Sequence, residues 1–189
     1  MSGTSACTLI EAAEAWIEPY WNAEHLRRAR DWLLVIEPDA SEAARLAALT
    51  HDMERHFPGG PEYDPGTMAP DEESYRRAHS ERSAAIVGDW LTEQGAAEEL
   101  MARVRGLIEL HEIGGTPEAN LVQAADSLSF LETNTGLVRG WVVKGRCDVE
   151  RAKRQHERMF ERIQVERARE LARPLYERAL ASVSGEDDR

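Results

Sequence analysis

Four histidines and two aspartates in this chain follow one another in an order that suits metal binding. Imidazole nitrogens and carboxylate oxygens are the usual ligands of divalent transition metals. Six such groups are too many for one tetrahedral site, but they suit two ions that share a bridging carboxylate. Two ions about 3.5–4 Å apart activate water or bind a phosphoryl group. The six residues are His25, His51, Asp52, His79, His111 and Asp126.

Each of these residues has an ordinary explanation when it is taken alone. His25 and His79 suit exposed helix positions, and His111 suits the carboxyl end of a helix, where a cation is favoured. Asp126 is harder to explain, because its neighbours Ala124, Ala125 and Leu128 predict a buried helix face. A buried carboxylate needs a cationic partner, and a metal held by the preceding histidines would supply one. Asp52 is the natural bridging ligand, since adjacent helical residues differ by about 100° in direction.

The elements that must position these groups are predicted to be helices, which gives an all-α fold. Asn22 favours a helix start just before His25, and Asp39 with Glu42 resembles a capping box. Pro117 suits the first position of a helix, whereas Pro174 predicts a kink or break. Residues 133–147 are predicted to be irregular and partly extended. The predicted helices are 9–17, 23 to about 37, 39 to about 53, 71–94, 96–112, 117–132 and a long C-terminal helix over 148–182.

Residues 57–70 form the clearest loop, with four prolines and three glycines among fourteen residues. Its position directly after the His51-Asp52 pair is consistent with a lid or a substrate-binding segment. A purely structural connector is an equal alternative.

The length, net charge and hydrophobicity of the chain limit the kinds of function that it can have. At 189 residues the chain is expected to form a single domain, 1–189, with a metal-binding core over about 20–135 and a helical extension over 148–183. A net charge of −12 disfavours binding to a nucleic acid polymer. The sequence has no apolar run of about 18 residues and no secretory signal, so a cytoplasmic protein with no membrane partner is expected. A monomer and a homodimer both remain open.

Charge is uneven along the chain. Residues 139–178 carry twelve basic and seven acidic residues, although the chain as a whole is acidic. One interpretation is a solvated helix with many ion pairs at i,i+4 spacing. The other is that a few of these cations face a small anionic substrate.

The order His, His-Asp, His, His, Asp on successive helices resembles the HD superfamily of metal-dependent phosphohydrolases. The resemblance covers about residues 20–135 and is supported by the segments LAALTHDMER, HSERSAAIVGDWL, LIELHEIGG and AADSLSFLE. The two extra histidines, His79 and His111, are similar to those of the dinuclear branch. An HD-like helical bundle is therefore the expected architecture. The paired histidines and the Gly-Tyr-Pro segment of cyclic-dinucleotide phosphodiesterases are missing, so that activity is not expected.

The resemblance implies a role for each matching residue. His25, His51, Asp52 and Asp126 would hold the first ion, and Asp52, His79 and His111 the second, with a hydroxide between them. The ions are expected to be iron or manganese, with cobalt, nickel, zinc or magnesium as alternatives. Arg55 occupies the offset at which related phosphodiesterases carry a phosphate-binding lysine, which makes Asp52 and Arg55 the predicted catalytic residues. The predicted substrate-binding cations are Arg55, Arg82, Lys144, Arg146, Lys153 and Arg154.

The resemblance and the ligand types together favour hydrolysis of a phosphoester, in a nucleotide or another small phosphorylated metabolite, by a metal-activated hydroxide. A di-iron oxygenase of the same superfamily, acting on a small polar or phosphonate substrate, is the alternative, because metal ligands alone do not fix the metal. A third class is a binding module that keeps the metal without turnover. Oxygen dependence separates the first two classes, and inactivity with every metal indicates the third.

Overall fold

The computed structural model describes residues 8–185, and every regular element in that range is a helix. This confirms the all-α prediction, including a long C-terminal helix. No helix in this range is both long and apolar enough to cross a bilayer. The elements are α1 (Leu9–Ile17), α2 (Ala23–Ile36), α3 (Glu42–Thr50), the 3-10 helix η1 (Met53–His56), α4 (Glu73–Glu93), α5 (Glu98–Leu110), α6 (Pro117–Thr133), α7 (Thr135–Val143), α8 (Val149–Glu161) and α9 (Glu166–Ser184).

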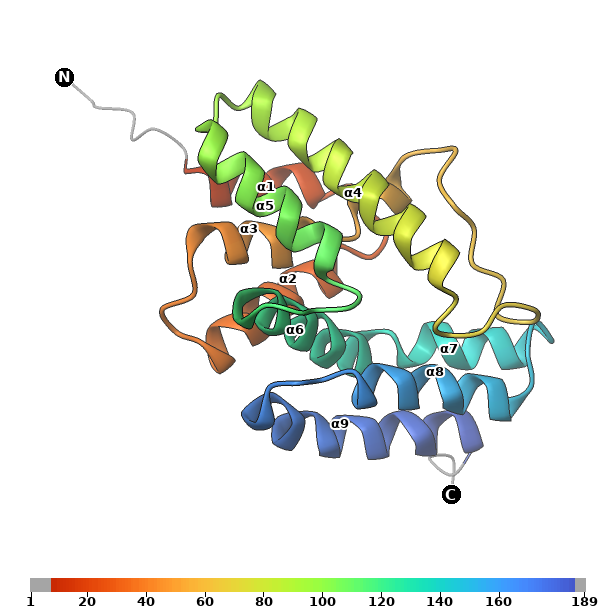
Figure 1. The fold of residues 1–189 in the computed structure, drawn as a ribbon. Coiled ribbons are helices and arrows are strands. Elements are labelled where there is room, and N and C mark those ends of the chain that lie inside the picture. The colour runs from red at the N-terminus through yellow and green to blue at the C-terminus, as the bar shows by residue number, and fades with distance from the viewer. Residues whose placement is uncertain (1–7, 186–189) are drawn as a thin grey trace.

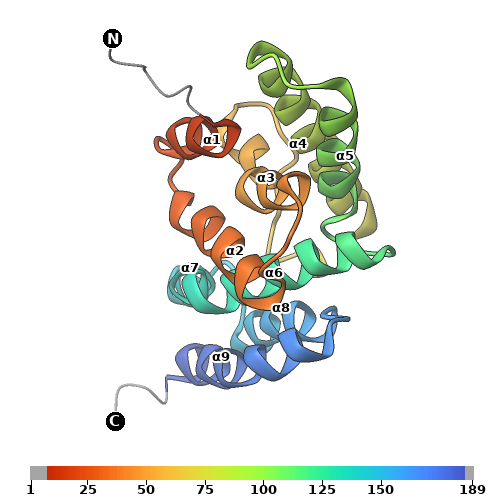
Figure 2. The same ribbon diagram turned by 90° about the vertical axis from the view of Figure 1, so that its left-hand side faces the viewer.

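Helix α6 runs through the middle of the molecule (Figures 1 and 2). It packs against α2 on one side and against α8 and α9 on another, while α4 and α5 form a pair farther away. Small residues such as Ala124, Ala125 and Ser127 are fully buried and let the neighbouring helices approach closely. A side chain in the middle of α6, such as Asp126, is therefore directed into the protein interior.

Helix α3 is shorter than the sequence predicts. Its amino end is capped by Ser41, whose hydroxyl accepts a hydrogen bond from the Ala44 amide, and not by Asp39. Its last residue is Thr50, His51 is the C-cap, and Asp52 precedes the 3-10 helix. The predicted continuation to Met53 was wrong. His51 keeps helical backbone angles (φ −55°, ψ −28°), whereas Asp52 departs from them (φ −104°, ψ 7°), so the turn sets the direction of the Asp52 side chain.

The C-terminal third also differs from the prediction. Residues 135–143 form helix α7, although two glycines and several valines give this segment little helix propensity. Burial of Val138 against Ala152 and Val183 supplies the stabilisation that propensity lacks.

The predicted single helix over 148–182 is two helices, α8 and α9. The chain turns at Arg162–Val165 and not at Pro174. Pro174 lies inside α9 on its exposed face, where the carbonyl group that loses its hydrogen bond is accessible to water. The turn places α9 back along α8, and its alanine-rich seam covers α6.

Candidate metal centre

All six predicted ligand residues are buried, and they lie in or at the ends of the elements from α2 to α6. His25 lies in the first turn of α2, His79 in the second turn of α4, and Asp126 in the middle of α6. His51 and His111 are the C-cap residues of α3 and α5, where a helix end turns its side chain inward. None of the four histidines in this set exposes more than 2% of its surface, and Asp52 and Asp126 expose 8% and 5%.

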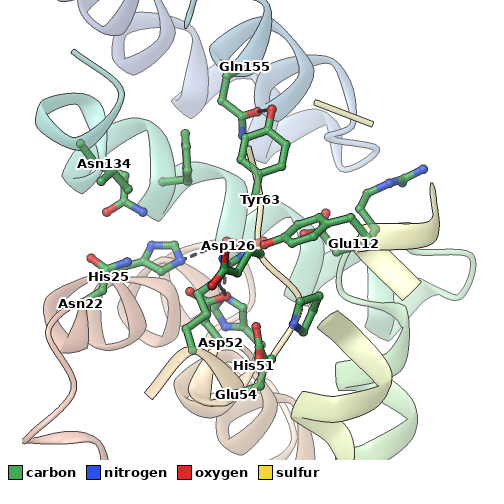
Figure 3. Close-up of a pocket in the computed structure, with 18 of the residues that line it drawn as sticks. Asn22, His25, His51, Asp52, Glu54, Tyr63, Glu112, Asp126, Asn134 and Gln155 are labelled. Atoms are coloured by element: carbon green, nitrogen blue, oxygen red, sulfur yellow. Dashed lines mark hydrogen bonds and ion pairs between the residues drawn. The ribbon is translucent and has the colours of Figure 1, made fainter. Parts of the chain in front are cut away.

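His25, His51 and Asp126 form the first group. The Nε2 atoms of His25 and His51 lie 3.2 and 3.3 Å from the same oxygen, Oδ1 of Asp126. Their potential ligand atoms all lie within 4.8 Å of one another, which is the spacing that one metal ion requires. The close-up in Figure 3 shows His25 and His51 converging on Asp126 from two different helices.

His79 and His111 form a second group with Glu112, again with ligand atoms within 4.8 Å of one another. The His111 ring lies 5.0 Å from the His51 ring, measured between centroids, so the two groups are neighbours. Glu112 was not among the predicted ligands. Its position next to His111 in the sequence was the available signal.

Asp52 lies beside the second group. Its Oδ1 atom is 3.1 Å from Nε2 of His79 and accepts a hydrogen bond of 2.7 Å from Nε of Arg55. Its Oδ2 atom accepts a 2.9 Å hydrogen bond from the hydroxyl of Tyr20. The structure thus brings Asp52 to His79, but Asp52 belongs to neither of the two groups whose ligand atoms all lie within 4.8 Å of one another, and its oxygens accept from Tyr20 and Arg55.

The protein fixes the tautomer of His51 and His111 through backbone carbonyl groups. Nδ1 of His51 lies 3.0 Å from the Ala48 oxygen, and Nδ1 of His111 lies 2.6 Å from the Ile108 oxygen. A carbonyl oxygen only accepts, so Nδ1 carries the proton in each ring. Each Nε2 atom then presents a lone pair when the ring is neutral.

Side chains fix the tautomers of the other two histidines, His79 and His25. Nδ1 of His79 donates to Oε1 of Glu54 at 2.8 Å. The Ser129 hydroxyl donates to the His25 carbonyl group at 2.6 Å, so at 2.9 Å it accepts from Nδ1 of His25. Metal-binding histidines commonly use the second nitrogen in this way. All four Nε2 atoms are therefore available as ligands.

Carboxylate oxygens face these lone pairs. Among the described residues, the buried Nε2 atoms of His51 and His79 have no hydrogen-bond partner, yet each lies about 3 Å from a carboxylate oxygen. A lone pair and a carboxylate oxygen repel at that distance unless a cation lies between them. The donor set therefore fits divalent transition-metal ions, and proton binding by the imidazoles is the alternative source of charge.

The electrostatics keep the carboxylates ionised. Burial opposes ionisation of Asp52 and Asp126, but the guanidinium groups of Arg55 and Arg162 outweigh it and hold both pKa values well below the usual range. Burial lowers the pKa of His111 to about 3, with a further contribution from His51. His111 is consequently a neutral imidazole at physiological pH, which is the state a metal ligand needs.

Arg162 is the cationic partner of Asp126 that the sequence argument assigned to a metal. It follows α8, and its Nη2 atom contacts Oδ2 of Asp126. Its Nη1 atom donates to Glu112 at 2.7 Å, and its Nε atom donates to the Ser127 hydroxyl at 2.7 Å. Arg162 therefore connects the first group to the second, and it leaves Oδ1 of Asp126 facing the histidines.

Arg55 and Arg82 are the predicted substrate-binding cations that follow the ligands Asp52 and His79 by three residues, and they have different positions in the structure. Arg55 lies against Asp52, stacks over Tyr75 and lines the pocket described below. Arg82 does not line it. Its guanidinium group binds Oε2 of Glu54 at 2.8 Å and the carbonyl group of Pro58 at 2.8 Å, so it holds the 57–70 loop against α4.

Of the predicted cations near α7 and α8, Arg146 lines the pocket. Lys144 and Arg154 are exposed elsewhere, and Lys153 pairs with Glu150 at 3.5 Å. The basic side chain that enters the pocket from α8 is Arg158, on another face of that helix. One face of α8 is buried and the opposite face is solvated, so sequence position alone did not separate them.

A pocket of about 480 Å³ opens directly above these groups. Its floor contains His25, His51, Asp52, His111 and Asp126. Residues 57–63 of the loop form one wall, and the Tyr63 hydroxyl reaches Gln155 of α8 at 3.5 Å (Figure 3). The 57–70 loop therefore shapes the pocket and is more than a connector.

The sequence matches the model of one protein family. A family model described as a domain of unknown function (DUF4202) matches residues 12–139, and the chain belongs to this family. The matched range contains all six predicted ligands, whereas Arg146, Arg158 and Arg162 lie beyond it. No curated protein and no solved structure matches the sequence.

Proposed function

We propose that this member of the DUF4202 family is a metal-dependent phosphohydrolase that acts on a nucleotide or another small phosphorylated metabolite. One observation carries the proposal. Four buried imidazoles have Nδ1 bound to the protein and Nε2 turned toward carboxylates, and three of them, His25, His51 and His111, line a pocket with several arginines.

The ligand order supports placing the chain in the HD superfamily of phosphohydrolases, in its dinuclear branch. His25, His51 and Asp126 would hold one ion, and His79 and His111 the other. Asp52 would lie between the ions and Glu112 at the edge of the second. Iron and manganese suit such mixed nitrogen and oxygen ligands best.

Divalent ions in this position lower the pKa of water and neutralise charge on a phosphoryl group. The chain contributes orientation and further charge. Tyr20 and Arg55 fix the Asp52 carboxylate through its two oxygens. Arg55 keeps its terminal nitrogens for a phosphoryl oxygen, since the contact with Asp52 uses Nε.

Elemental analysis and phosphate release test the proposal together. Protein purified without added metal should contain close to two transition-metal ions per chain. It should release phosphate from a panel of nucleotides and sugar phosphates in the presence of Mn²⁺, Fe²⁺, Co²⁺ or Mg²⁺. Asp52→Ala and His51→Ala should lose metal and lower the rate at least 100-fold, because ligand loss removes the ion.

His56 supplies a matched control, because it is exposed and lies one turn beyond Asp52 without reaching the pocket. His56→Ala should keep both metal and activity. Metal retention with no phosphate release under any ion would contradict hydrolysis. Turnover that stops under anaerobic conditions would favour the di-iron oxygenase instead.

A further inference from the structure

The pocket extends beyond the predicted metal ligands to a wall that carries three arginines. Arg76 comes from α4, Arg158 from α8, and Arg146 from the turn between α7 and α8. None of the three is adjacent to another in the sequence, so it is the fold that gathers them. A volume of about 480 Å³ also exceeds what one phosphate group fills.

Arg76 is the most informative of the three. It lies three residues before His79 on α4, half-buried at the pocket wall. Its Nε atom is buried without a hydrogen-bond partner, and no carboxylate among residues 8–185 lies within ion-pair distance of its side chain. Its neighbour Arg77 instead points outward and pairs with Glu73 at 3.0 Å. A guanidinium group that is partly desolvated and unpaired is costly unless a ligand completes it.

Arg158 adds a second positive charge next to Arg76. Its side chain is 13% exposed, and its Nη2 atom donates to Oε2 of Glu112 at 2.6 Å. The same Glu112 oxygen also accepts from Arg162. Burial lowers the pKa of Arg158, and the Arg162 and Arg76 guanidinium groups add to that effect. Glu112 thus pairs with two arginines, whereas Arg76 pairs with no carboxylate in the described part of the chain.

We propose that Arg76 and Arg158 form a second anion subsite in this pocket, with Arg146 at its rim. The substrate would then carry two anionic groups. This inference rests on the proposed function for the first group, a phosphate above the histidines and Asp52. The second group is a phosphate or a carboxylate, both of which bind guanidinium groups through two parallel hydrogen bonds.

Binding measurements test the subsite without requiring turnover. Three probes share one phosphorylated three-carbon frame: glycerol 3-phosphate, 3-phosphoglycerate and glycerol 1,3-bisphosphate. Isothermal titration of the metal-loaded full chain should give at least tenfold tighter binding of one of the two probes that carry a second anionic group than of glycerol 3-phosphate. Preference for 3-phosphoglycerate identifies a carboxylate as the second group, and preference for glycerol 1,3-bisphosphate identifies a phosphate.

Variants assign the preference to the subsite. Arg76→Gln should remove the tenfold preference and leave the affinity for glycerol 3-phosphate within twofold. Arg77→Gln is the matched control, since it removes the same charge from the adjacent exposed position, and it should keep the preference. Arg76→Lys should restore part of it. Thermal unfolding of each variant confirms that it is folded.

Two outcomes would overturn the inference: equal affinity of the wild-type protein for all three probes, or an equal loss for all three in Arg76→Gln. If the proposed function were wrong, the result would be different: the purified protein would contain no metal or would release no phosphate. The preference can also be measured in His51→Ala, where the arginines are unchanged. Its persistence there would support the subsite even if hydrolysis were disproved.

Discussion

Arg162 shows how a single side chain joins two parts of the centre. Its three nitrogens contact Asp126, Glu112 and Ser127, and its side chain is 8% exposed. It is one of twelve basic residues between positions 139 and 178, and nothing in the sequence distinguishes it from the others. The ligands could be predicted because histidines are few and ordered. Their arginine partner could not, because its role depends on which way α8 turns.

Replacing Arg162 with methionine should destabilise the protein by about 3–5 kcal/mol, because it leaves the buried Asp126 carboxylate without its guanidinium partner, while Glu112 keeps Arg158. Chemical denaturation of the metal-free protein measures the free energy of unfolding directly. Arg167→Met, at an exposed position of α9, is the control and should change it by less than about 0.5 kcal/mol. A loss below about 1 kcal/mol for Arg162→Met would show that the pair contributes little.

His156 is a buried histidine that the centre does not use. Neither ring nitrogen has a hydrogen-bond partner among the described residues, and burial lowers its pKa to about 4. The unfolded chain binds this proton near pH 6.5. The unfolded state is therefore favoured as pH falls, and the stability that neutral His156 permits is lost between about pH 7 and pH 4.

Between pH 7.5 and pH 5, this residue should account for about 2 kcal/mol of the fall in stability. His156→Leu should therefore lose about that much less stability than the wild type over the same interval, as measured by urea denaturation at each pH. The exposed His56→Leu variant should follow the wild type. Identical pH dependence in His156→Leu and the wild type would contradict a neutral buried imidazole.

At the scale of elements, local signals predicted where most helices begin. Pro117 starts α6 as expected, with Thr116 as its N-cap, and α1 and α2 match their predicted ranges closely. The failures were those in which tertiary contacts override local preference. Helix α7 depends on burial of Val138, and the turn between α8 and α9 depends on Ile163, which is 1% exposed. Neither contact has a signature in the local sequence.

Gly60 tests how tightly the 57–70 loop is held. A Cβ atom there would lie 2.2 Å from Oε2 of Glu54 and 2.6 Å from Nη1 of Arg82, the pair that fastens the loop to α4. Gly60→Ala should destabilise the protein by about 1–3 kcal/mol, because the buried Glu54 carboxylate and the Arg82 guanidinium group must shift to make room for the methyl group. It should also speed proteolytic cleavage within residues 57–70.

Gly106 provides a control at which the same substitution should change the stability in the opposite direction. It lies inside α5, and a Cβ atom there meets nothing within 4 Å. Gly106→Ala should stabilise the helix by about 0.5–1 kcal/mol, since alanine loses less backbone entropy than glycine. If Gly60→Ala were equally harmless in thermal unfolding and proteolysis, the loop would be free to move away from Glu54.

At the scale of the whole molecule, the centre lies where separate parts of the fold meet. Its potential ligands come from α2, from the end of α3, from α4, from the end of α5, and from α6. Arg162 ties this set to the C-terminal helices. A cation bound there interacts with elements that separate when the chain unfolds. Metal binding should therefore stabilise the folded state as a whole.

Removing metal with a chelator should accordingly lower the Tm of the entire cooperative transition. Free metal at 100 times its Kd contributes about 2.7 kcal/mol, which corresponds to about 5–10 °C for a chain of this size. His25→Ala should abolish the difference between loaded and chelated protein, whereas His56→Ala should retain it. Scanning calorimetry with and without metal measures both. If chelation left the Tm of the wild type unchanged while His25→Ala lowered it, the histidines would serve the fold through proton-mediated pairing with Asp126, and no metal would be needed to hold these helices together.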